Sequence, residues 1–375
     1  MVARSTLCGW TPNPTEVRAL LDDKTFTSVT RWAAEYTRNL TPRGGLPMRR
    51  ANPDEYILKS PEPWQQPIDL PDYDIDWSEL RDQPPVLLYE ALFHFLKHWK
   101  RGAQGIGDCV SWGWELACTI AAAVQAFNSR GEFAFSGEYA TEPIYGGSRV
   151  EARGKKRGGY SDGSYGGAAA KWVTIWGALL RQNYSHVNGA NKEYDLTSYS
   201  SDKAKEWGNY GCGGEDDADK LDLHAKEFPV RHAVLCTTFD QSALAIANGY
   251  PVAVCSGYGF GSRGAGGWLQ RKGSWSHCML FCGVRFDKPG LLLANSWGNS
   301  WGDKMQHYPE TMPSEFKKCS GWVSRDDVNG MLRGEDSFAV GQLELKRQPL
   351  VWLDVVQGLG LGRTRRSKKS LFAAA

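Results

Sequence analysis

The sequence lacks any long apolar run. Residues 1–21 mix Arg4, Cys8, Pro12 and Glu16, whereas the central part of a secretory signal is continuously apolar. Elsewhere, charged and polar residues interrupt every apolar stretch before it reaches the roughly 18 residues that a membrane span requires. We therefore expect neither a secretory signal nor a membrane-spanning helix.

An excess of charge of one sign is also missing. Lysine and arginine together number 44, and aspartate and glutamate 42, which gives a formal net charge of +2. A protein that binds nucleic acid or an anionic membrane surface is typically strongly basic on at least one face. Neither nucleic acid nor a membrane is therefore an expected partner.

The nine cysteines include no Cys-x-x-Cys pair. A disulfide framework is typical of small secreted domains, so mostly free thiols are expected here. Cys278 and Cys282 lie near His277, but inward-facing strand positions explain them better than zinc ligation does. We expect no metal and no other cofactor.

The apolar residues that are present suffice for a large core. The chain has 375 residues, of which 41% are hydrophobic, and this length suits two domains or one two-lobed domain with extensions. Residues 1–85 form a Pro-rich arm and residues 86–305 the main domain. Residues 306–356 are expected to complete its strand-rich part, and residues 357–375 form a Gly-rich, basic tail that is expected to be disordered.

The spacing of apolar residues changes along the main domain from helical to alternating. Helices are expected at residues 17–36 of the arm and at 86–100, 109–127, 168–180 and 241–248, the last capped by Asp240. Strands are expected at residues 233–238, 252–256, 276–284 and 291–295, and loops at 154–167 and 188–219. A helical first half and a strand-rich second half predict an α+β fold with two lobes.

Cys109 has the setting of a nucleophile. It follows the glycine-punctuated stretch Gly102–Asp108 and begins a long apolar run, so it is expected where a loop turns into a helix. A single cysteine in an apolar run is more often a small buried hydrophobic residue. At a helix N-terminus, however, unpaired N–H groups and the helix dipole favour a thiolate.

His277 and Asn295 are candidates for a base and for the group that orients it. In the expected strand 276–284, His277 points to one face and Cys278 to the other, so the imidazole can face a cleft. A turn near Pro289 and a second strand follow. This hairpin would bring Asn295 back beside His277.

Several stretches resemble motifs of the papain family of cysteine peptidases. Asn295-Ser296-Trp297-Gly298, followed by Trp301-Gly302, resembles the asparagine motif of that family, and residues 104–109 resemble its glutamine-to-cysteine motif. Gly166-Gly167-Ala168 resembles the glycine pair of its substrate groove, and residues 248–252 resemble the segment before its histidine. The order Cys, His, Asn is also that of the family, and the resemblance covers roughly residues 102–303.

The resemblance implies a papain-like two-lobed fold, with Cys109 on the helical lobe and His277 and Asn295 on the strand-rich lobe. It also implies hydrolysis of peptide bonds in peptide or protein substrates through an acyl-enzyme. Cys109 would be the thiolate nucleophile, His277 the base, Asn295 its orienting group and Gln104 an oxyanion donor. The implied substrate-binding residues are Gly166, Gly167 and Trp297, the last also shielding the bond between His277 and Asn295.

Three positions depart from the family pattern. Gln104 lies five positions before Cys109, where the family usually has six. Val110 stands where a tryptophan usually follows the nucleophile, and Ser276 precedes His277 where many members have aspartate.

Other functions would suit the same residues. A papain-like fold could serve without catalysis as a structural or docking module, for example in a virus particle, although such a module has no need of all four site residues. An amidase, an isopeptidase or a transferase would use the same chemistry. The expected location is the cytoplasm or a virus particle.

The arm before Pro85 could inhibit the enzyme or dock elsewhere. Inhibitory arms in the papain family are helical domains that pass backwards through the groove, and they need two or more helices. Here only one helix is expected, and the many prolines between Pro47 and Pro85 favour extended chain. We expect the arm to stay attached and to bind the outer surface of the enzyme or a protein partner.

Overall fold

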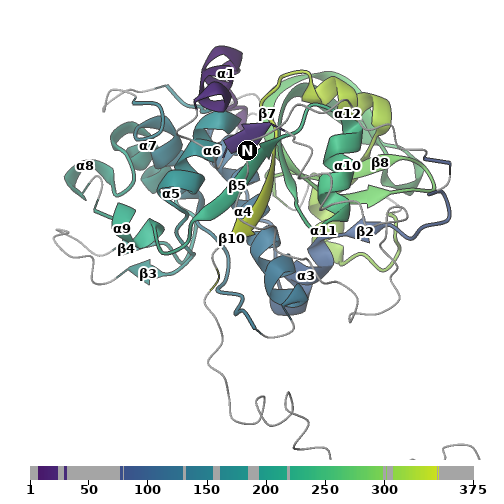
Figure 1. Cartoon of the computed structure of the whole chain (residues 1–375), viewed down its shortest axis with the longest axis horizontal. Coiled ribbons are helices and arrows are strands. Elements are labelled where there is room, and N and C mark those ends of the chain that lie inside the picture. Colours follow the sequence, from purple (N-terminus) through teal and green to yellow (C-terminus); the bar gives the residue numbers. More distant parts are fainter. Residues whose placement is uncertain are drawn as a thin grey trace, which may run out of the picture.

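The chain folds into two lobes, one largely helical and the other built around a sheet (Figure 1). The computed structural model describes residues 7–23, 29–31, 77–78, 80–129, 132–154, 161–184, 194–217, 220–298, 301, 307–343 and 345. The α+β, two-lobed architecture that the sequence predicts is confirmed. No helix of the described residues is long and apolar enough to cross a membrane.

Helix α4 (Cys109–Asn128) lies at the centre of the molecule. Small and apolar residues occupy nearly its whole circumference, which suits a helix that is surrounded by protein, and most of its 20 residues are buried. The rest of the helical lobe comprises α5 (Thr141–Arg149), α6 (Gly166–Ile175), α7 (Ser201–Tyr210), α8 (Gly214–Asp217), α9 (Asp222–Ala225) and the hairpin of β3 (Asn183–Tyr184) and β4 (Tyr194–Asp195).

The second lobe contains a sheet with the strand order β1-β5-β10-β6-β7-β8-β9, and β2 pairs with β7. Its strands are β1 (Val29–Arg31), β2 (Val86–Leu87), β5 (Val230–Leu235), β6 (Val252–Arg263), β7 (Leu269–Arg285), β8 (Gly290–Ala294), β9 (Ser320–Ser324) and β10 (Phe338–Leu343). All pairings are antiparallel except that of β1 with β5. The remaining elements are α3 (Tyr89–Phe95), α10 (Phe239–Ala247), η3 (Ala265–Gly267), α11 (Ser314–Cys319) and α12 (Arg325–Leu332).

The N-terminal helix differs from the expected one. Helix α1 spans Pro14–Asp22 instead of residues 17–36. Proline is favoured at the first helical position, and the Asn13 side chain accepts the N–H of Glu16, so the helix begins before the apolar pattern does. Residues 24–28 and 32–36 of the expected helix lie outside the described residues.

Other boundaries change where tertiary pairing or capping competes with the periodic pattern. The expected helix 86–100 shrinks to α3, because Val86 and Leu87 pair with β7 instead. The expected loop 188–219 contains β4, α7 and α8, and the Ser200 side chain caps α7. Thr238, not Asp240, caps α10.

The elements that carry the candidate site match the sequence expectation well. Helix 109–127 and the strands 276–284 and 291–295 are confirmed as α4, β7 and β8, with β7 extending back to Leu269. Strands β9 and β10 both follow residue 306 and join the sheet, while the domain bounds expected from the sequence stay a prediction. The tail, residues 357–375, lies outside the described residues.

Candidate active site

Cys109 is the first residue of α4 and is fully buried. Asp108 occupies the N-cap position, but its carboxylate makes no capping bond to the helix. One of its oxygens instead accepts the indole N–H of Trp112 at 3.2 Å and the hydroxyl of Tyr199 at 3.0 Å. The first N–H groups of α4 are thus left without a side-chain cap beside the thiol, as an anion-binding helix end requires.

His277 on β7 and Asn295, directly after β8, are brought together by antiparallel pairing of these strands. His277 Nε2 lies 2.8 Å from Asn295 Oδ1, which also accepts the N–H of Ser296 at 2.7 Å. The indole of Trp297 stacks on the imidazole, with ring centroids 4.6 Å apart. The ring is therefore held at one nitrogen and on one face, which leaves Nδ1 as the nitrogen available for proton transfer.

Gln104 lies in the same site despite its shortened spacing from Cys109. Its Oε1 accepts the hydroxyl of Ser296 at 2.5 Å, and its backbone N–H donates to Ser296 O at 3.0 Å. Because the oxygen end of the amide is occupied, Nε2 is left to donate to Leu7 O at 2.7 Å and Ile106 O at 2.9 Å. Ser296 thus fixes which end of the Gln104 amide serves as a donor.

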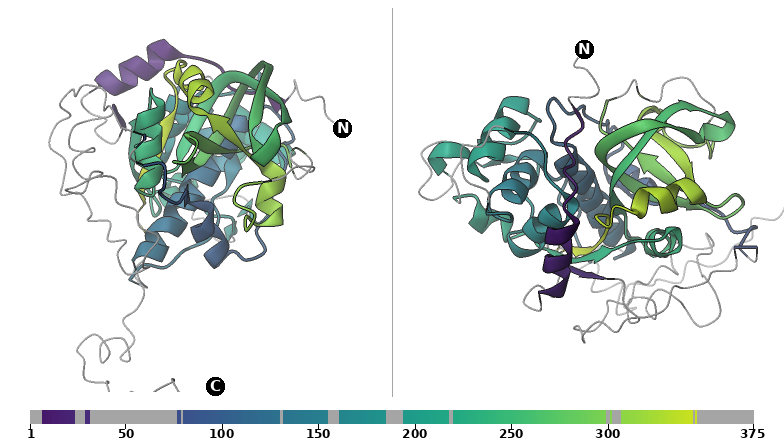
Figure 2. Two further views of the ribbon diagram at one scale, coloured as in Figure 1. Left: turned by 90° about the vertical axis from the view of Figure 1, so that its right-hand side faces the viewer. Right: turned by 90° about the horizontal axis from the view of Figure 1, so that it is seen from above.

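The N-terminal stretch Leu7–Asn13, here called the covering segment, lies across these residues. Figure 2 (right) shows it in purple, passing between the two lobes. Its Gly9 N–H donates to Cys109 Sγ at 3.2 Å, and its Leu7 carbonyl accepts the side-chain N–H of Gln104. A Cβ at Gly9 would lie 1.7 Å from the carbonyl oxygen of Gly107, so only glycine allows the chain to pass this close.

The covering segment is bound through its backbone on two sides, by Ser276 of β7 and by Ser164 of the helical lobe. On the strand side, Trp10 N donates to Ser276 O at 3.0 Å. On the helical side, Thr11 N donates to Ser164 O at 2.7 Å, and Ser164 N donates to Gly9 O at 2.8 Å. Trp10 and Ser164 form a parallel β-bridge. The expectation that the arm binds the outer surface is therefore wrong for residues 7–13, and a partner for the remaining arm residues stays a prediction.

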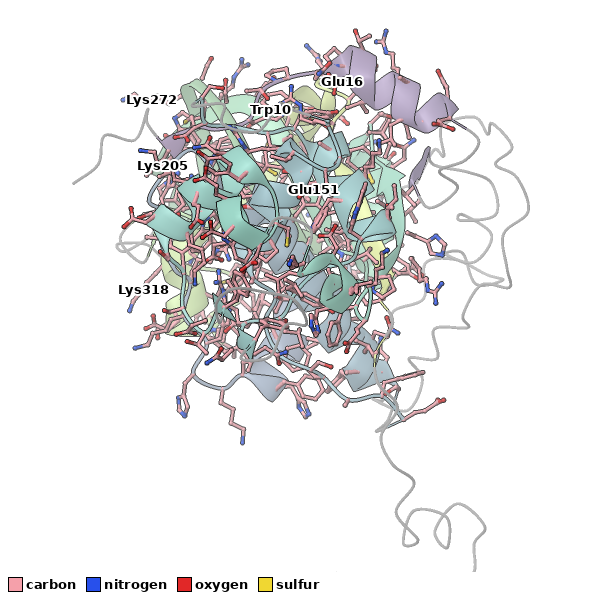
Figure 3. All side chains as sticks on the ribbon, turned by 90° about the vertical axis from the view of Figure 1, so that its left-hand side faces the viewer. Trp10, Glu16, Glu151, Lys205, Lys272 and Lys318 are labelled. Carbon is pink, nitrogen blue, oxygen red and sulfur yellow. The ribbon has the colours of Figure 1, made fainter. Side chains whose placement is uncertain are left out.

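The side chain of Trp10 anchors the covering segment. Its indole N–H donates to Asp336 at 2.8 Å, and its ring packs beside Gly334. Figure 3 labels Trp10 and the nearby Glu16 of α1, whose carboxylate binds the hydroxyl of Tyr165. Burial raises the pKa of Asp336 to about 7, although bonds from Gly166, Trp10 and Gly167 act to lower it.

Gly166 and Gly167 are held by Asp336, the residue that also binds Trp10. They begin α6, and their N–H groups donate to the two oxygens of Asp336, both at 2.7 Å. Their backbone donors are thus engaged, and Gly163 and Ser164 face the covering segment instead. A substrate-binding role of Gly166 and Gly167 stays a prediction.

Burial in the covered site favours the neutral forms of Cys109 and His277. Burial raises the pKa of the Cys109 thiol well above its ordinary value. Burial also lowers the pKa of His277 to about 4, while the Asn295 bond acts to raise it and the charge of Arg101 to lower it. Within the described part of the chain, His277 Nδ1 has no hydrogen-bond partner. Both shifts favour a neutral thiol and a neutral imidazole while the site is covered, and the ion pair expected from the sequence stays a prediction for the uncovered site.

Several residues of the site escaped the sequence analysis as functional residues. These are the covering segment, Ser296, Asp336 and Arg101. Only Ser296 carried a signal, because it lies inside the Asn-Ser-Trp-Gly string. Among the described residues, no group of three or more His, Cys, Asp or Glu side chains could hold a metal ion, and all nine cysteines are free thiols.

The fold resembles those of known cysteine proteases. Xylellain, a cysteine protease from Xylella fastidiosa, is 14% identical with a TM-score of 0.45, covering 74% of this chain and 94% of that one. Digestive procathepsin L 3 of Tenebrio molitor is 15% identical with a TM-score of 0.37, over 70% and 71%. ProCathepsin B S9 from Trypanosoma congolense is 12% identical with a TM-score of 0.39, over 73% and 83%. No family model and no curated protein sequence matches the chain.

Proposed function

We propose that this protein is a cysteine peptidase that hydrolyses peptide bonds through a covalent acyl-enzyme. The observation that supports this most directly is the covering segment itself. An extended polypeptide lies against Cys109 and Gln104, and both walls of the site bind its backbone N–H and C=O groups. Backbone contacts of this kind recognise peptide chains regardless of side chain. The substrate class is therefore a peptide or a protein.

Catalysis would begin when the covering segment is displaced. Water and substrate would then enter the site, and the desolvation that keeps Cys109 and His277 neutral would diminish. His277 Nδ1 would take the thiol proton, and the thiolate would attack the carbonyl carbon of the scissile bond. The resulting oxyanion would receive hydrogen bonds from Gln104 Nε2 and from the N–H of Cys109, which as the first residue of α4 has no intrahelical acceptor.

The tetrahedral intermediate would break down by expelling the amine. Protonated His277 would give its proton to the leaving amine nitrogen as the C–N bond breaks, leaving a thioester on Cys109. His277 would next take a proton from water, whose oxygen attacks the thioester and releases the acid. Asn295 stays neutral throughout, because the charge is held by Cys109 and His277.

The test is to incubate the full chain with a diverse peptide library and to identify the cuts by mass spectrometry. We expect cleavage by the wild type and none by Cys109→Ala or His277→Ala. The variant Trp10→Ala, in which the anchor of the covering segment is lost, is included because the covered form should act slowly. If neither the wild type nor Trp10→Ala cuts any peptide, the peptidase proposal fails and a docking role for the fold is favoured.

A further inference from the structure

Arg101 makes three directed contacts in the interior, close to the catalytic residues but outside them. Its Nη1 lies 2.8 Å from Glu115 Oε2, its Nη2 donates to Trp112 O at 2.8 Å, and its Nε donates to Asn295 O at 3.3 Å. The guanidinium also lies 4.9 Å from the centroid of the Trp112 ring. Each of the three guanidinium nitrogens thus donates to a separate acceptor. A lysine ammonium group cannot reproduce this planar arrangement of donors.

These contacts join two elements that carry different catalytic residues. Glu115 and Trp112 belong to α4, whose first residue is Cys109. Asn295 follows β8 and holds the imidazole of His277. Arg101 therefore fixes the distance between the helix that carries the nucleophile and the chain that orients the base.

The free energy needed to desolvate the buried Arg101–Glu115 pair suggests that the pair has a role beyond stability. The side chains of Arg101 and Glu115 are only 4% and 6% exposed. A buried ion pair contributes little to stability, because desolvation of two charges offsets most of their attraction. Glu115 is held in turn by Thr119, whose hydroxyl donates to Oε1 at 3.1 Å, and Thr119 Oγ1 accepts the N–H of Tyr139 at 3.1 Å. The pair is therefore locked in one geometry.

We propose that Arg101 is a positioning residue of the active site, acting through Asn295. The proposal rests on the peptidase function proposed above. Loss of the guanidinium fork should let the Asn295 loop shift relative to α4, and displacements of about 1 Å at a reacting pair can cost on the order of 100-fold in rate. Substrate binding should change little, because Arg101 is buried behind the site and does not reach the covering segment through any described contact.

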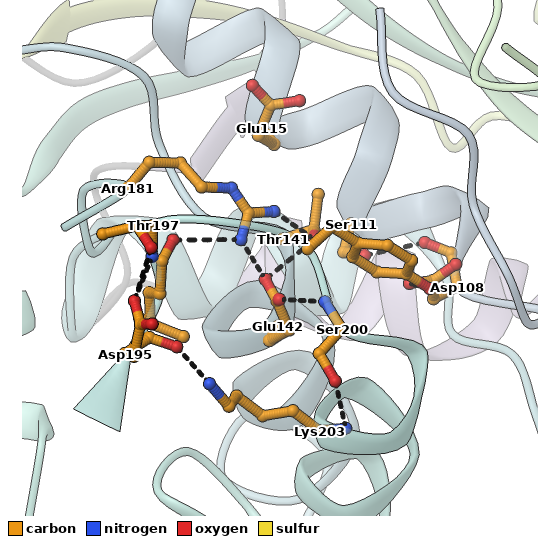
Figure 4. Close-up of polar contacts among 12 residues, drawn as sticks. Asp108, Ser111, Glu115, Thr141, Glu142, Arg181, Asp195, Thr197, Ser200 and Lys203 are labelled. Carbon is orange, nitrogen blue, oxygen red and sulfur yellow. Dashed lines mark hydrogen bonds and ion pairs between the residues drawn. The ribbon is translucent and has the colours of Figure 1, made fainter. Parts of the chain in front are cut away.

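The chain offers a matched control for a buried arginine–glutamate pair. Arg181 lies 2.7 Å from Glu142, with side chains 14% and 0% exposed, and also donates to Thr141 (Figure 4). This pair lies in the helical lobe and has no described contact with Cys109, His277 or Asn295. Arg181→Lys should therefore lower stability in the same way as Arg101→Lys while leaving turnover within about threefold of the wild type.

The experiment compares Arg101→Lys and Arg181→Lys in the full chain, each alone and combined with Asn295→Ala. We expect Arg101→Lys to lower kcat roughly 10- to 100-fold with KM nearly unchanged. When Asn295→Ala is already present, adding Arg101→Lys should lower kcat by about threefold or less, because Arg101 acts through Asn295. An equal factor in both backgrounds, or an equal loss for Arg181→Lys, would overturn the proposal.

A second variant and a second measurement keep the test independent of folding and of the peptidase assay. Arg101→Met combined with Glu115→Met removes both charges, so that no unpaired charge remains buried, and it should show the same loss of kcat. The rate of alkylation of Cys109 by iodoacetamide, measured against pH, reports the pairing of Cys109 with His277 without any substrate. If no peptide is cut, the peptidase function fails, whereas an alkylation profile that Arg101→Lys leaves unchanged contradicts the positioning role.

Discussion

At the scale of single residues, burial changes the pKa of Asp108, the residue directly before Cys109. One carboxylate oxygen has two donors, whereas Oδ1 has no partner among the described residues. Burial raises the pKa of Asp108 to about 8. A pKa this high favours the neutral carboxyl group below pH 7, in which form Asp108 does not oppose a thiolate at Cys109 by its charge.

Asp108→Asn should make the free energy of unfolding less sensitive to pH between about pH 4 and pH 8. Between about pH 4 and pH 8 the folded wild type keeps a proton that the unfolded chain loses, so wild-type stability falls as the pH rises through this window. The amide variant has no such proton. Between pH 5 and pH 8, the free energy of unfolding in urea should fall by at least about 1 kcal/mol less in the variant than in the wild type. The same difference between the two proteins at both pH values would contradict this interpretation.

The second prediction at this scale concerns Gln104. Its Nε2 donates to the Leu7 carbonyl oxygen, and in the proposed mechanism the substrate oxyanion would replace that oxygen. Gln104→Ala should lower kcat by roughly 10²–10³-fold with little change in KM, as expected when one oxyanion donor is lost. Steady-state kinetics on a peptide from the library test this. Unchanged turnover would assign the donor role to another group.

At the scale of elements, the packing of α4 on β7 sets the geometry between Cys109 and His277. Gly113 is the residue at which the two elements meet. A Cβ at this position would lie 2.7 Å from Cys278 Sγ and 3.0 Å from Met279 O. Neither neighbour can yield easily, because both belong to the central strand that carries His277.

Gly113→Ala should therefore push α4 away from β7. We expect a loss of about 1–3 kcal/mol in the free energy of unfolding, as is typical of overpacked cores, together with reduced turnover. Gly257→Ala on β6 is the control, because a Cβ there meets nothing within 4 Å, and it should leave both quantities nearly unchanged. Denaturant unfolding and peptide hydrolysis measure the two effects, and equal behaviour of the two variants would contradict this account.

At the scale of the whole molecule, the N-terminal stretch passes between the lobes and contacts Cys109 and Gln104. Trp10 anchors it through Asp336, and α1 continues it along the outside through Glu16 and Tyr165. Under the proposed peptidase function, the covered form should cleave peptides slowly, because Gly9 lies against Cys109 Sγ where a substrate would have to enter.

Trp10→Ala in the full chain should expose the site. We expect iodoacetamide to label Cys109 at least about tenfold faster than in the wild type, since loss of a buried aromatic anchor costs several kcal/mol of binding. Mass spectrometry of the alkylated chain measures the rate. Arg18→Ala, which removes only an exposed ion pair of α1 with Glu335, is the control. Equal labelling of both variants would mean that Trp10 does not hold the cover.

The sequence by itself determined the helix that begins at Cys109, the hairpin that pairs His277 with Asn295, and the residue types of the site. These features rest on local periodicity and on short motifs, in which neighbours along the chain are also neighbours in space. The bounds of α1 and α6 were missed because proline, capping and tertiary contacts moved the helix starts.

Only the tertiary structure decided what covers the site and what holds it in register. Trp10 meets Asp336 across 326 positions of sequence, and Arg101 meets Asn295 across 194. Contacts of such span depend on how whole elements pack, and no periodic pattern encodes them. The covering segment likewise reaches Cys109 across 100 positions of sequence, and the burial that favours neutral Cys109 and His277 arises only when the elements pack together.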